Sequence, residues 1–242
     1  SRTGCLMELC KKKLFTPESN SLEGEVWIGI SFASSFRLII QWEIASQESY
    51  LADPLIASTE QRLSHNCWPI WVSDGLDAYG NALKKRHHMI QTFPCTAKRG
   101  RPRRPKLVAH PQLFYGQFVK QRDERYRITH VEKRVVYGSV ALADITTSYI
   151  ERQNLNFRHE IRRLSRKTIA FSKKIDALKD HLSLYQATFN LTRPHRGLAR
   201  KSEDPLMNWG VRKWQPVTSA MAAGLTNHVW SLKELLSYKL LS

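Results

Sequence analysis

The sequence lacks the features of a zinc-binding, exported or membrane-spanning protein. Its four cysteines, Cys5, Cys10, Cys67 and Cys95, form no C-x-x-C pair. Because structural zinc sites usually combine two closely spaced ligand pairs, we predict free thiols in a reducing cytosol. No run of about 18 apolar residues and no signal peptide is visible, so we expect neither a membrane span nor export.

Acidic residues are also scarce. The 242 residues include 21 Asp and Glu against 38 Lys and Arg, which gives a formal net charge of +17. Such an excess indicates a polyanionic partner, most simply DNA, although a generically basic protein such as a ribosomal one would share it. Because 42% of the residues are hydrophobic, we predict a packed core rather than a disordered basic tail.

The spacing of apolar residues predicts a mixed α/β domain. Strands and helices alternate in the first half, followed by two further strands, of which at least one should extend the central sheet. The predicted strands are Gly4–Cys10, a hairpin over Glu25–Ile44, Trp68–Val72, Leu113–Lys120 and Tyr126–Tyr137. The predicted helices are Ser49–Leu63, Leu76–Arg86, Ser148–Lys174 and Ile175–Asn190.

The helix predicted over Ser148–Lys174 has one conspicuous acidic residue. Ile150, Phe157 and other apolar residues recur at helical spacing, and arginines and lysines cover the remaining faces. Glu151 stands in the first turn, inside this positive field. Spacing alone favours an acid that is stabilised by the helix dipole, whereas the functional interpretation is a carboxylate that binds metal beside nucleic acid.

The run Tyr149–Arg158, YIERQNLNFR, with Arg163–Thr168 and Phe171–Lys173 after it, resembles the last catalytic segment of bacterial insertion-sequence transposases. The resemblance is to the insertion-sequence-one type within the DDE class. It implies that Glu151 is the third catalytic carboxylate. It also implies an RNase H-like fold, in which a mixed central sheet is flanked by helices.

The same resemblance assigns a role to Asp74. This residue follows the apolar run WPIWV and belongs to a Ser-Asp-Gly string that is similar to the end of the fourth strand in these transposases. The alternative is a turn aspartate before glycine. The family reaction, DNA strand cleavage and transfer, uses two Mg²⁺ or Mn²⁺ ions about 3.5–4 Å apart, held by three carboxylates. The resemblance therefore implies metal ligation by Asp74 and Glu151.

The first strand departs from the family pattern. The family has an Asp in a D-E-L string where this chain has Met7, Glu8 and Leu9. A thioether does not replace a carboxylate toward Mg²⁺, and Glu8 is a weak candidate because neighbouring strand residues face opposite sides unless the strand slips or bulges. We therefore expect impaired catalysis in a truncated or decayed copy. An active enzyme that uses Glu8 and a non-catalytic DNA-binding protein remain alternatives.

Basic segments predict where DNA would bind. Ala97–Lys106 contains an Arg-Gly-Arg-Pro core that resembles an AT-hook, and a solvated basic loop is the alternative. With the basic helix, this gives eleven candidate DNA-binding residues: Arg99, Arg101, Arg103, Arg104, Arg152, Asn154, Arg158, Arg162, Arg166, Lys167 and Lys173. The expected partners are transposon ends and target DNA, in the cytoplasm at the nucleoid. A homodimer or higher multimer is expected by analogy only.

The predicted organisation has four parts. Residues 1–95 form the first part of the RNase H-like core, and 96–140 form a basic insertion with the AT-hook-like loop and a strand pair. Residues 141–205 form the helical second part that carries Glu151. Residues 206–242 are a C-terminal appendage, in which Ala220–Trp230 is similar to the C-terminus of a subset of these transposases.

Overall fold

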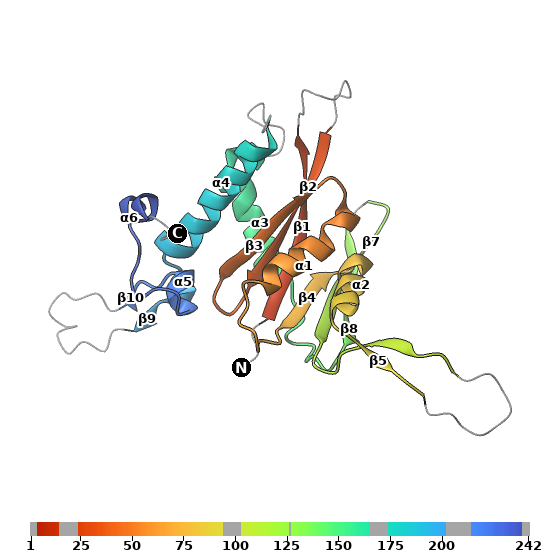
Figure 1. Cartoon of the computed structure of the whole chain (residues 1–242). Coiled ribbons are helices and arrows are strands. Elements are labelled where there is room, and N and C mark those ends of the chain that lie inside the picture. The colour runs from red at the N-terminus through yellow and green to blue at the C-terminus, as the bar shows by residue number, and fades with distance from the viewer. Residues whose placement is uncertain are drawn as a thin grey trace.

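The computed structural model describes residues 4–14, 24–93, 103–125, 127–164, 174–201 and 214–238, and only the backbone of residues 4–14, 24 and 25. Its centre is a six-stranded sheet with the order β3-β2-β1-β4-β7-β8 (Figure 1). The strands are β1 (Gly4–Leu14), β2 (Gly24–Ala33), β3 (Leu38–Ala45), β4 (Ile70–Asp74), β7 (Phe114–Arg122) and β8 (Ile128–Tyr137).

The sheet is mixed, as predicted. β4 runs parallel to both of its neighbours, β1 and β7, and the other pairs are antiparallel. Both strands predicted after the basic loop extend this sheet as β7 and β8. A mixed sheet covered by helices is compatible with an RNase H-like fold.

Two helices cover one face of the sheet (Figure 1). They are α1 (Ala52–Glu60), preceded by the short helix η1 (Glu48–Tyr50), and α2 (Asp77–Arg86). Their apolar residues, Leu55 and Leu83 among them, share one buried cluster with Trp71 and Tyr115 of the sheet. Both helices were predicted: Ser49–Leu63 extends beyond α1 at both ends, and Leu76–Arg86 differs from α2 only by starting one residue earlier.

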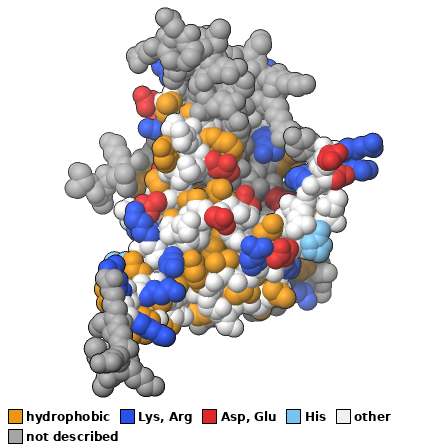
Figure 2. Space-filling model, turned by 90° about the vertical axis from the view of Figure 1, so that its right-hand side faces the viewer, with side chains coloured by type: hydrophobic (Ala, Val, Ile, Leu, Met, Phe, Trp, Pro, Cys, Tyr) orange, Lys and Arg blue, Asp and Glu red, His pale blue; other side chains and the backbone are white. Residues whose placement is uncertain are grey.

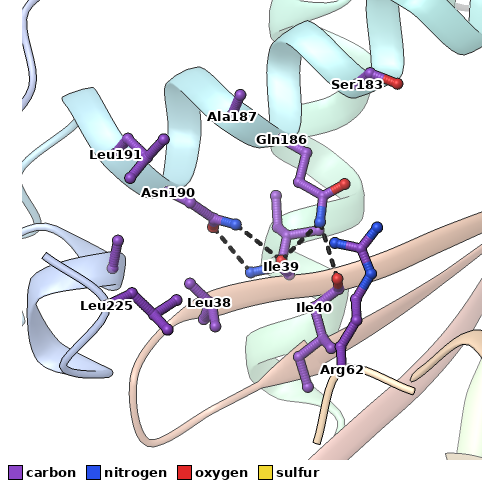
Figure 3. A pocket seen from close by; sticks show the side chains of 11 residues that line it. Leu38, Ile39, Ile40, Arg62, Ser183, Gln186, Ala187, Asn190, Leu191 and Leu225 are labelled. Atoms are coloured by element: carbon purple, nitrogen blue, oxygen red, sulfur yellow. Dashed lines mark hydrogen bonds between the residues drawn. The ribbon is translucent and has the colours of Figure 1, made fainter. Parts of the chain in front are cut away.

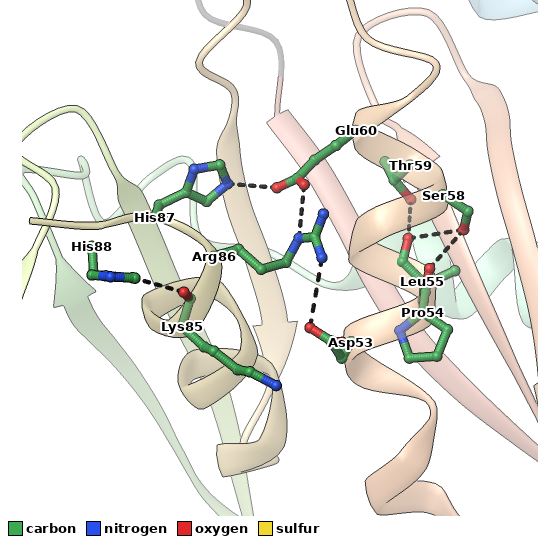
Figure 4. A network of polar contacts seen from close by, with 10 residues as sticks. All are labelled: Asp53, Pro54, Leu55, Ser58, Thr59, Glu60, Lys85, Arg86, His87 and His88. Atoms are coloured by element: carbon green, nitrogen blue, oxygen red, sulfur yellow. Dashed lines mark hydrogen bonds and ion pairs between the residues drawn. The ribbon is translucent and has the colours of Figure 1, made fainter.

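A polar network joins the ends of these two helices (Figure 4). Glu60 of α1 accepts a hydrogen bond from Arg86 at 2.8 Å and contacts the ring of His87 at 2.5 Å. Burial raises the pKa of Glu60, but hydrogen bonds and charges from His87 and Arg86 outweigh it, so the pKa is lowered. The network ties α1 to α2 beneath the sheet.

The opposite face is covered by α3 (Ser148–Glu160) and α4 (Ile175–Ala187). Phe157 of α3 and Leu182 of α4 pack in one buried cluster with Ile30 and Val72 of the sheet. This cluster fixes α3 beside the strands whose ends carry the candidate site.

The prediction of one helix from Ser148 to Lys174 is wrong. α3 ends at Glu160, and Ile161 has an extended backbone before a short 3-10 turn, η2 (Arg162–Leu164). Ile161 is fully buried and Leu164 is 2% exposed. The apolar spacing therefore predicted correctly that Ile161 and Leu164 are buried, although neither residue belongs to α3. The basic residues 165–173 lie outside the described residues.

Several small elements complete the fold and were not predicted. The antiparallel pair β5 (His88–Gln91) and β6 (Lys106–Ala109) leads into and out of the basic loop. The others are η3 (Thr188–Thr192), η4 (Arg196–Leu198), β9 (Arg200–Lys201), β10 (Trp214–Gln215), α5 (Ser219–Ala222) and α6 (Leu232–Ser237).

The end of α4 closes the free edge of β3 (Figure 3). Gln186 donates to the carbonyl oxygens of Ile39 at 3.0 Å and Ile40 at 2.9 Å, and Asn190 contacts both backbone groups of Ile39. An unpaired edge strand can pair with a strand of another chain, and these side-chain amides block such pairing by occupying backbone groups of β3.

The ring of His195 packs against the ring of Phe189, with 4.7 Å between their centres. Burial, with nearby arginine charges, lowers the pKa of His195 to about 4.

Asn190 and His195 both belong to the string FNLTRPH, Phe189–His195. Their contacts support packing, because Asn190 is buried and a neutral His195 brings no positive charge to DNA. Within the described ranges, every helix is too short or too polar to cross a membrane.

Candidate active site

A solvent-open hollow of about 410 Å³ lies where β4 and β7 end beside the start of α3. It brings Asp74 and Glu151, which are far apart in the sequence, to one site. Its lining residues are Glu48, Asp74, Gly75, Leu76, Phe118, Val119, Lys120, Arg122, Thr147 and Glu151.

Asp74 is the last residue of β4 and pairs with Phe118 of β7. Val72, two residues earlier, packs in the α3 cluster, and alternation along the strand places Asp74 on that same side. Its Oδ1 accepts a hydrogen bond from the Leu76 backbone N–H at 3.2 Å. Burial raises the pKa of Asp74, against the smaller effects of that hydrogen bond and of the positive charge of Lys120.

Glu151 enters the hollow from the first turn of α3. Its carboxylate accepts hydrogen bonds from the Lys120 ammonium and the Thr147 hydroxyl. Burial alone would raise the pKa of Glu151, but these hydrogen bonds, with the charges of Lys120 and Arg122, lower it overall. The Glu151 side chain is 38% exposed.

Thr147 holds Glu151 in place rather than capping the helix. It occupies the N-cap position of α3, where a threonine commonly accepts a backbone N–H, but its side chain makes no such bond. Thr147 is 3% exposed and donates its hydroxyl to the Glu151 carboxylate instead. The buried hydroxyl fixes one side of the acidic group.

Four lining residues were missed from the sequence: Glu48, Lys120, Arg122 and Thr147. A signal existed for Lys120, because it follows Phe118 by two residues and so shares the face on which Phe118 packs against the α3 cluster. The signal was weak, because the position of β7 beside β4 depends on the fold. Glu48 belongs to a loop, where no periodicity indicates contact.

The register of β1 bears on Met7 and Glu8, whose side chains lie outside the described residues. Met7 pairs with Ser31 of β2 and Ser73 of β4, and both serines bond to the α1/α2 side: Ser31 accepts from Thr59 at 2.8 Å, and Ser73 contacts the Tyr115 hydroxyl at 2.7 Å.

The neighbouring register position is different. Glu8 pairs with Ile30, which packs in the α3 cluster, and the residue after Ser73 is Asp74. The backbone position of Glu8 thus corresponds to described residues on the α3 side of the sheet.

The predicted DNA-binding residues fall into three groups. Arg99, Arg101, Arg166, Lys167 and Lys173 lie outside the described residues. Arg103, Arg104, Arg152 and Arg162 are exposed, and Arg158 is half-buried. Asn154 is 3% exposed on the inner face of α3, and its contact with DNA stays a prediction. On the face shown in Figure 2, Lys and Arg side chains lie among acidic and hydrophobic ones.

The carboxylates of Asp74 and Glu151 are the type of ligand that a divalent cation such as Mg²⁺ prefers. Hard cations such as Mg²⁺ and Mn²⁺ prefer oxygen ligands, and Asp74 and Glu151 offer them from two elements that line one hollow. Among the residues whose side chains are described, no cluster of three or more His, Cys, Asp or Glu is arranged to hold a metal. Glu8 of β1, whose side chain lies outside the described residues, stays the predicted third carboxylate.

Residues 124–188 match the sequence model of a family described as IS1 transposase. This segment is therefore similar to the IS1-type DDE transposases. It spans β8, α3 with Glu151, and α4, which is about a quarter of the chain; β1 and Asp74 precede it. Neither the curated proteins nor the solved structures include a significant match. The matched segment contributes Thr147 and Glu151 to the lining of the hollow.

Proposed function

We propose that this chain cleaves and transfers DNA strands in the manner of DDE transposases, with Asp74 and Glu151 as acidic residues of the active site. The observation that carries the proposal is their meeting in one open hollow, with Glu151 inside the IS1-type segment and Asp74 on a separate strand. A structural role alone gives no reason for both to line it.

Each residue of the hollow has a distinct task in the proposed reaction. Asp74 and Glu151 supply oxygen ligands for Mg²⁺ or Mn²⁺, which, when bound, would stabilise charge on the attacking and leaving oxygens of a phosphodiester. Thr147 orients the Glu151 carboxylate through its hydroxyl. Lys120 and Arg122 add positive charge where the DNA phosphate would lie.

We propose Glu8, rather than Met7, as the third acidic residue. Directly paired residues of neighbouring strands share a face of the sheet. Glu8 pairs with Ile30, which belongs to the α3 side, whereas Met7 pairs with serines bonded on the opposite side. The register supports a complete site without the strand slip that the sequence interpretation required.

A DNA-binding protein with impaired catalysis is the second candidate. It is supported by Met7 at the position where the family has Asp, and by the Lys120 ammonium on the Glu151 carboxylate. Such a protein would bind DNA with a strong salt dependence but would not cut it.

Nicking of supercoiled plasmid DNA in Mn²⁺ or Mg²⁺ separates these candidates. We expect Asp74→Asn, Glu151→Gln and Glu8→Gln each to lower the nicking rate by at least about 100-fold, equivalent to about 2.7 kcal/mol. Asp77→Asn is the matched control, because Asp77 is an exposed acid near Asp74 that does not line the hollow.

Met7→Asp distinguishes the remaining outcomes. If the unaltered chain does not nick DNA and Met7→Asp does, the chain is a damaged enzyme and Glu8 is not a ligand. If neither cuts but both bind DNA, the binding-only candidate holds. Full nicking by Asp74→Asn or Glu151→Gln would contradict the proposed site.

A further inference from the structure

Lys120 places a positive charge beside the acidic pair, in contact with Glu151. It lies on β7, with its side chain 25% exposed, and its ammonium contacts the Glu151 carboxylate. The ammonium also lies 5.6 Å from the centre of the Phe118 ring, within the range of a cation–π contact. Its positive charge acts on Asp74 as well. Lys120 thus contacts one candidate metal ligand, Glu151, and acts on the other, Asp74, through its charge.

The contact has no obvious purely structural purpose. Lys120 is in the last third of β7, where the sheet opens into the hollow, and its partner Glu151 is already held by Thr147. A partly exposed ion pair contributes little to folding stability. The main effect of the Lys120 ammonium is instead local: its positive charge offsets the negative charge of the partly buried Glu151 carboxylate.

We propose that Lys120 is an internal cation that competes with divalent metal for the Asp74–Glu151 pair. This inference rests on the proposed function and specifies how its site is regulated. An ammonium and a divalent cation repel each other at such short range, so metal binding must displace Lys120 from Glu151.

The displaced Lys120 ammonium could bind a phosphate group of the DNA. An incoming DNA phosphate would accept the Lys120 hydrogen bond and leave Glu151 to the metal. DNA and metal would then strengthen each other's binding by the same factor, as linkage requires. The metal site would reach its full affinity only when the substrate is present.

Binding of Mn²⁺, measured by the electron paramagnetic resonance of the free ion, tests the competition without any activity assay. We expect Lys120→Gln to tighten Mn²⁺ binding by about tenfold or more in the absence of DNA. Two variants serve as controls. Lys133→Gln removes the same charge from β8, where the Lys133 ammonium donates to the Leu142 carbonyl oxygen. Thr147→Val removes the other hydrogen bond to Glu151 without changing charge.

Lys133→Gln should leave Mn²⁺ affinity unchanged, and Thr147→Val should lower it, because the Thr147 hydroxyl orients the Glu151 carboxylate. The gain in Lys120→Gln should disappear when Glu151→Gln is added. A short duplex DNA should tighten Mn²⁺ binding in the unaltered chain and do so less in Lys120→Gln. Lys120→Arg keeps the positive charge and should bind Mn²⁺ as weakly as the unaltered chain. It thus separates the loss of the charge from the effect of a substitution at this position.

The outcomes separate this inference from the proposed function. If Lys120→Gln binds Mn²⁺ no better than the unaltered chain while Glu151→Gln weakens both, the metal site stands and the competition is refuted. If no variant binds Mn²⁺ at millimolar concentrations, the metal site itself is refuted, and the inference with it.

Discussion

The side-chain amide of Asn190 occupies both backbone hydrogen-bonding groups of Ile39, on the edge strand β3. Its Oδ1 accepts from the Ile39 N–H at 3.1 Å, and its Nδ2 donates to the Ile39 carbonyl oxygen at 2.8 Å. Both contacts are buried, so Asn190 takes the place of a neighbouring strand at this point (Figure 3). This contact fastens the helical half of the chain, which carries Glu151, to the sheet that carries Asp74.

Removing this amide should destabilise the fold. We expect Asn190→Ala to lower the free energy of unfolding by about 2–4 kcal/mol, because two buried backbone groups lose their partner. Urea denaturation measures the change. Ser183→Ala is the control, since Ser183 lines the same pocket as Asn190, drawn in Figure 3, but is exposed, and its effect should stay within about 0.5 kcal/mol. Equal effects of the two changes would show that the Asn190 contact is not structural.

Asp74→Asn should stabilise the metal-free protein at neutral pH. The folded-state pKa of Asp74 is raised by burial above the ordinary value of 3.8, so ionisation at higher pH costs folding stability. Asparagine carries no charge and keeps an oxygen for the Leu76 N–H. The gain, on the order of 1 kcal/mol at pH 7, should vanish as the pH falls below about 4. Urea denaturation between pH 4 and 8 tests this, and destabilisation at pH 7 would contradict it.

Glu151→Gln should act in the opposite direction. Hydrogen bonds and positive charge outweigh burial and lower the folded-state pKa of Glu151 below 4.5, so the ionised group stabilises the fold above that pH and the contribution disappears as the pH falls through the folded-state pKa. Because the side chain is partly exposed, the loss at pH 7 should be under about 1 kcal/mol. The same urea series provides the measurement. At pH 7 we therefore expect Asp74→Asn to raise the free energy of unfolding and Glu151→Gln to lower it.

Two glycines with positive φ angles should respond differently to alanine. Gly138, at φ 68°, follows β8, and an added Cβ would lie 2.5 Å from the Leu113 carbonyl oxygen. Gly224, at φ 76°, has no neighbour within 4 Å of that position. We expect Gly224→Ala to cost about 1 kcal/mol from backbone strain and Gly138→Ala clearly more, because a backbone atom must also move. Thermal unfolding compares them, and equal costs would contradict the close approach.

The elements with strong periodic patterns could be predicted from the sequence. The hairpin of β2 and β3, helices α1 and α2, and strands β7 and β8 all appear where apolar spacing placed them. The end of α3 could not be predicted in this way, because Ile161 and Leu164 continue the apolar pattern after the helix has ended. The apolar spacing indicates which residues are buried, but an extended segment can bury such residues as well as a helix does.

The candidate site was only partly accessible from the sequence. Asp74 and Glu151 emerged through the family resemblance, and the fold then placed them in one hollow. Thr147 could not be found, and for Lys120 strand alternation gave only a weak signal, because the role of both residues depends on three-dimensional contact with Glu151. Likewise, the different positions of Met7 and Glu8 follow from strand register, which no single strand reveals.

The most direct test of the account is an anomalous-diffraction map of a crystal soaked in Mn²⁺. The account predicts a peak in the hollow, shared by carboxylate oxygens of Asp74 and Glu151 at about 2.1 Å, with the Lys120 ammonium moved away from Glu151. A hollow without an anomalous peak, at a Mn²⁺ concentration that supports DNA nicking in solution, would contradict it.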